Sequence, residues 1–408
     1  MTKKSDPVPT VGPSGHENWC AANRGEPSRG AFEVALYTDV RVIGQVDSGC
    51  GPYALLNTIA LPRDEQAWPR VILRCEWHLS ADTDLRMTKT DDSRYYGGGP
   101  ADEIAALLSL ALGARFQAGP RSRTFHPGDD PRGRPIGWDN RPTPQLPPRA
   151  MAPVVPSLMG ERTITPSTLA GYDLLPPKDA VALARAARAY QNAVWIADAE
   201  PNLAWLLLVS ALDTAATHWR ISAGSPVDVL RAVRPDWATL LETGGSALLE
   251  NMAAQLLPLL GSTRRFRDFV LEHLPDPPPD RPAEAWARLD WEKGKMRKTI
   301  DRVYDLRSHA LHGSKPFPYP MCEPPQGGIK PAAEIPPGLA TAAQDGIWRS
   351  EDTPLLLHTF EYIARGALLR WRDGMIARAR GKTPDQSNDK AIGDKVDPPD
   401  DPPTSAGS

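Results

Sequence analysis

The chain has 408 residues, of which 41% are apolar, so it can fill the cores of two or three domains. Its formal net charge of -3 and pI near 6.3 exclude a global attraction to nucleic acids or acidic membranes, and any polyanion must bind a local patch. The most apolar run, residues 202–213, is shorter than the ~20 residues of a transmembrane helix. We therefore expect a soluble globular protein that does not bind membranes.

Cysteine spacing favours neither a zinc site nor a disulfide framework, because the four cysteines form no Cys-x-x-Cys pair. They are Cys20, Cys50, Cys75 and Cys322. The opening MTKKSDPVPT is polar and lacks the apolar segment of a secretory leader. We expect a cytoplasmic protein with no metal and no cofactor.

The N-terminal part of the chain alternates between polar and strand-like segments. Residues 1–30 are polar and rich in Gly and Pro, so we expect a flexible N-terminus. Within 31–118, runs such as AFEVALYTDVRVIGQV and RVILRCEWHLS precede one short helical segment, ADEIAALLSLALGA. This pattern predicts an α+β domain with a mainly antiparallel sheet. Residues 119–177, rich in Pro, Gly and Arg, are expected to form an extended connector.

The C-terminal half is predicted to be an all-α bundle over residues 178–380, which makes the whole chain α+β. Proline clusters separate its helical segments. Helices are predicted at 178–199, 201–219, 226–233, 246–257, 262–273, 283–312 and 353–380. The tail, 381–408, is rich in Asp, Pro, Lys and Ser and is expected to be disordered.

The stretch RVYDLRSHALHGS, residues 302–314, places an arginine in an apolar helix face. At about 100° per residue, Arg307 lies near the middle of this face. The face comprises Met296, Ile300, Val303, Tyr304, Ala310 and Leu311. A buried charge without a partner costs several kcal/mol, as roughly estimated for desolvated ions. Arg307 must therefore meet either a carboxylate, with Asp213 and Asp305 as candidates, or an anionic ligand.

A histidine ends the same helix. Gly313 is the residue type expected just past a helix C-terminus, where a positive φ is commonly needed, and His312 precedes it. In an ideal helix Arg307 and His312 would lie about 140° apart. A residue at a helix end is released from this geometry, so we expect the two side chains to converge on one group.

The segment YDLRSHALHG resembles the R-x4-H signature of the HEPN superfamily, in particular its ApeA-like group, with Arg307 and His312 at the two ends. The segments WLLLVSALDTAATHW and YIARGALLRW are also similar to that group. The resemblance covers about half the chain and implies a HEPN-type helical bundle. It also implies a metal-independent endoribonuclease that dimerises with two motifs facing one cleft, although some members have lost catalysis.

The residue types suit that chemistry. An imidazole titrates near pH 6.5 when unperturbed, so His312 can take the proton of a 2′-hydroxyl. Arg307 offers a permanently charged donor fork to the phosphorane. The expected products carry a 2′,3′-cyclic phosphate and a 5′-hydroxyl. Four residues are expected to support the pair: Tyr304, Ser308, His309 and Asp213.

Local charge agrees with an RNA ligand. Residues 281–315 carry nine Lys and Arg against five acids. Such an excess can hold a nucleic-acid backbone. The expected RNA-binding residues are Lys295, Lys298, Arg302 and Lys315.

We therefore expect an endoribonuclease that acts as a toxin or as an antiviral defence effector by abortive infection. Its expected partners are RNA, with tRNA as one candidate, a second copy of the chain bound through the helical domain, and a phage-derived or small-molecule trigger at the N-terminal domain. That domain would be a sensor or restraint, an assignment by analogy alone.

Two alternative functions stay open. The helical domain could be a non-catalytic RNA-binding or protein-assembly module, or the N-terminal domain could be the functional centre with the helices as its scaffold. Each site residue also has a structural interpretation: Arg307 as an ion-pair partner, His312 as a helix cap, and the basic stretches as solvated helix faces.

Overall fold

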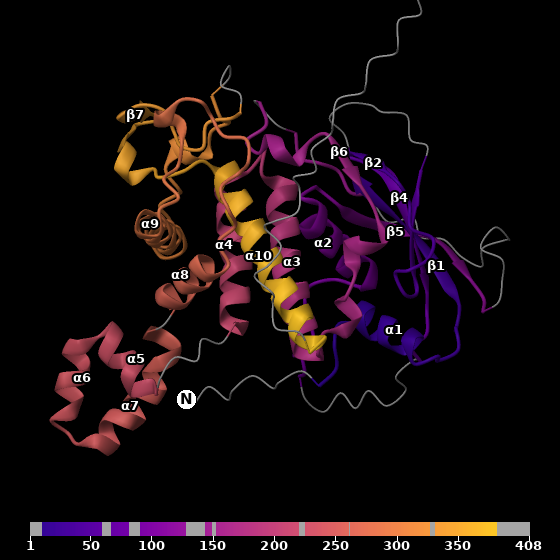
Figure 1. The fold of residues 1–408 in the computed structure, drawn as a ribbon, viewed down its shortest axis with the longest axis horizontal. Coiled ribbons are helices and arrows are strands. Elements are labelled where there is room, and N and C mark those ends of the chain that lie inside the picture. Colours follow the sequence, from indigo (N-terminus) through magenta and orange to yellow (C-terminus); the bar gives the residue numbers. More distant parts are fainter. Residues whose placement is uncertain are drawn as a thin grey trace, which may run out of the picture.

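The computed structural model describes residues 10–58, 67–80, 90–127, 143–148, 152–219, 225–260, 262–326 and 331–381. It is 50% helical and 14% strand, with an antiparallel sheet in the N-terminal region and helices in the C-terminal half (Figure 1). The predicted α+β class is confirmed at this level. Within the described ranges, no helix combines the length and apolarity needed to cross a bilayer. The predicted disordered tail lies outside these ranges, apart from its first residue.

A four-stranded antiparallel sheet forms one side of the molecule, in the order β3-β4-β1-β5. Its strands are β1 (Ala31–Thr38), β3 (Tyr53–Asn57), β4 (Trp68–Glu76) and β5 (Gln117–Phe125). The last strand, β5, crosses the predicted boundary at residue 118, and most of it lies in the predicted connector. Its sequence, QAGPRSRTF, has few apolar residues and contains a proline, which an edge strand tolerates because one side of its backbone is unpaired.

The second half of the predicted connector returns to the N-terminal region. Strand β6 (Glu161–Thr163) pairs in parallel with β2 (Arg41–Ile43). The residues around β6 that are buried in the core are Val154, Val155, Leu158 and Ile164. This part of the chain is therefore packed structure and not an extended linker, while 128–142 and 149–151 lie outside the described residues.

The prediction of a flexible N-terminus is wrong for residues 14–23, which form helix α1 (Ser14–Asn23). Its start is held by the fully buried Glu103 of helix α2 (Pro100–Leu112). The Glu103 carboxylate accepts hydrogen bonds from the backbone N–H groups of Gly15 (2.8 Å) and His16 (2.7 Å) and from the Tyr172 hydroxyl (2.7 Å). The first N–H groups of a helix have no partner within it, so a carboxylate from another element satisfies them.

Five helices carry the C-terminal half: α3 (Pro177–Ile196), α4 (Pro201–His218), α8 (Ser262–Glu272), α9 (Lys293–His312) and α10 (Leu357–Ala379). Figure 1 shows α2, α3, α4 and α10 between the sheet and the α8–α9 pair. Helix α9 starts ten residues later than the predicted 283. Glu292 caps it by accepting hydrogen bonds from the N–H groups of Gly294 (2.9 Å) and Lys295 (3.0 Å).

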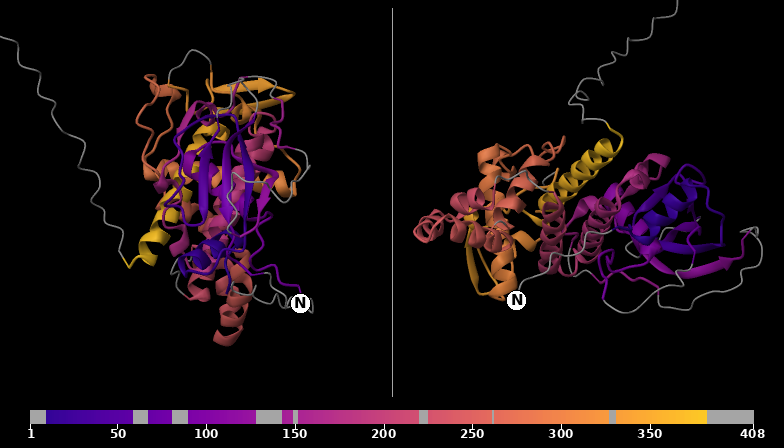
Figure 2. Two further views of the ribbon diagram at one scale, coloured as in Figure 1. Left: turned by 90° about the vertical axis from the view of Figure 1, so that its right-hand side faces the viewer. Right: turned by 90° about the horizontal axis from the view of Figure 1, so that it is seen from below.

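Three short helices and a hairpin lie at the far side of the bundle. Helices α5 (Pro226–Val233), α6 (Pro235–Glu242) and α7 (Ser246–Leu260) form a small lobe beyond α8 in Figure 1, with its own apolar cluster. The hairpin of β7 (Ala340–Ala343) and β8 (Gly346–Arg349) follows α9 along the chain. Figure 2 shows the lobe and the sheet at opposite ends of the molecule.

One hydrophobic core runs from the sheet into the bundle, across the predicted domain boundary, from Trp19 to Ile376. The buried Arg115 ties the same parts together. Its guanidinium donates to Asp39 (2.7 Å) beside the sheet, and to Asp198 (2.7 Å) and the Val194 carbonyl (2.8 Å) at the end of α3. The sheet and the bundle are therefore joined by apolar packing and by a charged link.

We expect the substitution Arg115→Ala to lower the free energy of unfolding by about 3–5 kcal/mol, because it leaves Asp39 and Asp198 without their cation in a buried site. Arg24→Ala is the control, since its ion pair with Glu26 is exposed and such pairs contribute about 1 kcal/mol or less. Urea unfolding of both variants measures the difference. Equal, small losses would mean that the charged link does not hold the two parts together.

Candidate nucleic-acid site at the end of helix α9

Helix α9 buries its apolar stripe along most of its length but not at its end. Met296, Ile300, Val303 and Tyr304 are buried, whereas Leu311 is 49% exposed. The expectation that Leu311 continues the stripe is therefore wrong. The last turn of α9 leaves the bundle, so residues 311–316 face solvent, and the chain returns to the core at Phe317.

Arg307 points from α9 to α4, where it meets Asp213. Its Nη2 lies 3.6 Å from Asp213 Oδ2, and the two side chains are 19% and 23% exposed. At 3.6 Å the contact is an ion pair but not a hydrogen bond of ordinary length. The guanidinium carbon also lies 5.4 Å from the ring centre of Tyr304, within cation–π range, and that ring packs on Phe266 of α8. Tyr304 therefore supports Arg307 from the core side.

Asp213 faces a second arginine. Burial raises the pKa of Asp213, and the positive charges of Arg307 and Arg265 of α8 oppose this rise. Among the residues that the structure describes, Arg307 Nε, Arg265 Nε and Asp213 Oδ1 are buried without a hydrogen-bond partner. Arg307 forms the ion pair with Asp213, and Arg265 adds a second positive charge nearby, which leaves local positive charge and unused buried donors. Arg265 was missed by the sequence analysis because only the packing of α8 on α9 reveals its place.

His312 lies at the exposed end of α9. Gly313 has φ −110°, so the expected left-handed glycine is absent, and Ser314 adopts the positive φ of 53° instead. In the described part of the chain, no hydrogen bond or ion pair joins His312 to Arg307. The two side chains, which would lie about 140° apart on an ideal helix, therefore make no direct contact within one chain.

The remaining predicted residues lie along the outer face of α9. Lys295, Lys298 and His309 are exposed, and Arg302 donates to Asp352 Oδ1 at 2.7 Å. At 100° per residue these four positions of α9 fall within an arc of about 60°. Ser308 is half-buried, and Lys315 is exposed just after the helix. Three of the predicted RNA-binding residues, Lys295, Lys298 and Arg302, therefore form a basic stripe on α9 that is separate from the Asp213 cluster, and Lys315 lies in the loop that follows.

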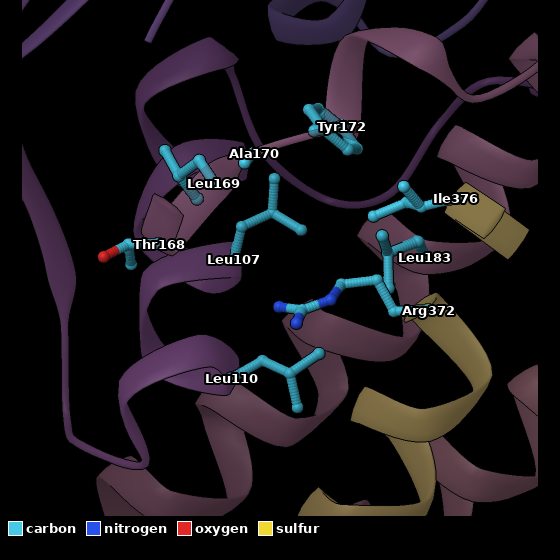
Figure 3. A pocket seen from close by; sticks show the side chains of 9 residues that line it. All are labelled: Leu107, Leu110, Thr168, Leu169, Ala170, Tyr172, Leu183, Arg372 and Ile376. Carbon is cyan, nitrogen blue, oxygen red and sulfur yellow. The ribbon is translucent and has the colours of Figure 1, made fainter. Parts of the chain in front are cut away.

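A cavity between α2, α3 and α10 is too small to serve as a ligand site. Figure 3 shows the guanidinium of Arg372 on α10 directed between Leu107 and Leu110 of α2. The space has a volume of about 10 Å³, which is at most the room of one water. Among the described residues, no group of three His, Cys, Asp or Glu side chains could hold a metal ion.

The raised pKa of Asp213 predicts the behaviour of Asp213→Asn. When the pKa of a carboxyl is higher in the folded than in the unfolded protein, the free energy of unfolding falls as the pH rises through both pKa values. At pH 7 the variant, whose side-chain amide is neutral, should therefore be at least as stable as the wild type in urea unfolding. Asp236→Asn, which breaks an exposed pair with Arg234, is the control, and its stability should hardly change.

A loss of more than about 1 kcal/mol in Asp213→Asn alone would instead identify Asp213–Arg307 as a stabilising structural pair, because exposed pairs contribute less than this.

Comparisons with known proteins do not assign a family to this chain. No family model, curated protein or solved structure matches it. The likeness of YDLRSHALHG to the HEPN signature therefore stays a prediction from short segments.

Proposed function

We propose that this chain is a metal-independent endoribonuclease of HEPN type, in which Arg307 binds the scissile phosphodiester and His312 acts on the 2′-hydroxyl. The observation that supports this proposal is the cluster around Asp213. Two arginines face one carboxylate, and the Nε–H groups of both are buried without a partner in the described part of the chain. A phosphate oxygen accepts such hydrogen bonds and neutralises the remaining charge.

The chemistry follows from these groups. The His312 imidazole accepts the proton of the 2′-hydroxyl, whose oxygen attacks the phosphorus. Charge collects on the phosphorane oxygens, where the Arg307 guanidinium stabilises it. The bond between phosphorus and the 5′-oxygen then breaks, and this oxygen takes a proton from water, while the protonated His312 returns its proton to solvent. The products carry a 2′,3′-cyclic phosphate and a 5′-hydroxyl. Asp213 positions Arg307 without saturating its donors, because their contact is longer than a hydrogen bond.

We expect a homodimer to complete the site. Arg307 faces α4 while His312 is exposed at the helix end, so a second copy packed on the helical domain would bring its own histidine close to this end of α9. The biological role that fits is a toxin or antiviral effector whose N-terminal part senses a trigger. Arg365 of α10 donates to the Leu110 (2.9 Å) and Ala111 (2.6 Å) carbonyls of α2, which offers a path from that part to the bundle.

A second candidate function is a non-catalytic RNA-binding module. It is favoured by the lack of a direct contact between Arg307 and His312 in the described chain, and by the basic stripe of Lys295, Lys298 and Arg302 on α9. RNA binding by such a module would weaken steeply with salt without any cleavage.

The substitutions Arg307→Ala and His312→Ala should each lower RNA cleavage in EDTA by at least about 100-fold, because each removes one catalytic group. Cleavage rates on total RNA and tRNA measure this effect, and circular dichroism and sedimentation should show unchanged folding and assembly. Leu311→Ala, an exposed neighbour, and Arg231→Ala, an exposed ion-pair residue of α5, are matched controls and should cleave as the wild type does. Full activity of either site variant would rule out the proposed mechanism.

A further inference from the structure

A second cavity opens beside the end of α9, between this helix, the loop that follows it and the β7–β8 hairpin. Its volume is about 200 Å³. That is several times the roughly 30 Å³ that one water occupies and below the ~300 Å³ of pockets for drug-sized ligands. The space suits a single heterocyclic ring system.

One wall of the cavity is apolar and comes from two separate segments. Trp348 and Ile347 of β8 face it from the hairpin, and Pro316 and Pro318 from the loop after α9. Ile347 is 79% exposed. The Trp348 indole lies against Gly346, where any side chain would overlap the ring. The absence of a side chain at Gly346 therefore makes room for the six-membered ring of the indole.

The other wall carries polar groups. Arg302 and Asp352 form an ion pair of 2.7 Å at the cavity, and Arg302 Nε is buried without a partner among the described residues. Lys315 and His309 line the opening and are exposed. Within the described ranges, the Lys315 ammonium has no ion-pair partner. The cavity is thus lined by a buried donor, Arg302 Nε, by the positive charge of Lys315 and by the aromatic ring of Trp348.

We propose that this cavity binds one nucleotide of the RNA substrate, with its base against Trp348 and its phosphate at Lys315 and His309. The proposal rests on the proposed function, since His309 precedes His312 by one turn of α9 and would place the bound nucleotide beside His312, on the side of the helix away from Arg307. Base–aromatic stacking accepts any base, and the Arg302–Asp352 pair offers both a donor and an acceptor to its edge.

The substrate class follows from this geometry. A base can enter the cavity only if it is unpaired and unstacked, as in single strands and loops. The chain should therefore bind single-stranded RNA and hairpin loops in preference to duplex RNA, although the basic stripe on α9 attracts the phosphates of both.

Binding can be measured apart from catalysis in full-length protein that carries His312→Ala. The probe is a fluorescein-labelled single-stranded RNA octamer, and its duplex with the complementary strand is the comparison; anisotropy gives the Kd over a salt series. Trp348→Ala should raise the single-strand Kd at least about fivefold, as expected for the loss of one stacked base, and leave the duplex Kd unchanged. Gly346→Ala, which displaces the indole without deleting it, should act in the same direction.

Two further variants separate this subsite from general binding. Lys315→Ala should lower the slope of log Kd against log salt by about 0.7, the value for one phosphate contact on a single strand. Trp286→Ala, which removes a 52% exposed indole outside the cavity, should leave the Kd unchanged.

An unchanged Kd in Trp348→Ala, an equal loss in Trp286→Ala, or no binding of the octamer at all would overturn the nucleotide subsite. Cleavage by the wild-type chain is measured separately. If the chain binds RNA through Trp348 but does not cut it, the nucleotide subsite is supported and the nuclease proposal is overturned. If Trp348→Ala cuts RNA as well as the wild type does, the nuclease proposal is supported and the nucleotide subsite is overturned.

Discussion

One buried carboxylate that pairs with Arg307 and lies in the positive field of Arg265 is the constraint on which the proposed site depends. Asp213 stands in α4, a helix whose other inward residues are apolar, and it faces Arg307 and Arg265 from two different helices. Burial disfavours its charge, and the arginines do not fully compensate, so its pKa stays raised. A pair optimised for stability would have closed to hydrogen-bond distance. This arrangement leaves donors free for an anion, which is typical of sites that bind and act.

The bundle that positions this cluster is continuous with the N-terminal sheet. Apolar side chains form one core, and buried charged groups mark the contacts between the parts: Glu103 at the start of α1 and Arg115 at the end of α3. A carboxylate or guanidinium at such a place tolerates little displacement, because each lost hydrogen bond leaves a desolvated charge. A ligand that moves α1 or α2 would therefore act on the helices behind them.

Much of the helical half could be predicted from local signals. Helices α3, α4 and α5 begin and end within about three residues of their predicted limits. Their starts could be predicted because each begins at a proline. Helix α1 was missed because its sequence, SGHENWCAAN, is short and weakly amphipathic, and it is held by Glu103 from elsewhere in the chain. The β7–β8 hairpin was missed because its turn uses Gln344 and Asp345 at positive φ, where Asn or Gly is the usual signal.

The candidate site divides in the same way. The place of Arg307 on the buried face could be found from helical periodicity. Asp213 was one of two partner candidates, beside Asp305, because an acid in an apolar helix is unusual. The second arginine, the loose ion pair and the cavity beside Trp348 depend on how α8 and the hairpin pack, which no local pattern encodes. Periodicity also placed Leu311 in the core, whereas the last turn of α9 leaves the bundle.

The most direct measurement of the central claim is the chemistry of the ends that the wild-type chain leaves on RNA in the presence of EDTA. Attack by the neighbouring 2′-oxygen, with Arg307 on the phosphate, predicts a 2′,3′-cyclic phosphate on one fragment and a 5′-hydroxyl on the other. Fragments with a 3′-hydroxyl and a 5′-phosphate, or RNA left intact, would contradict it.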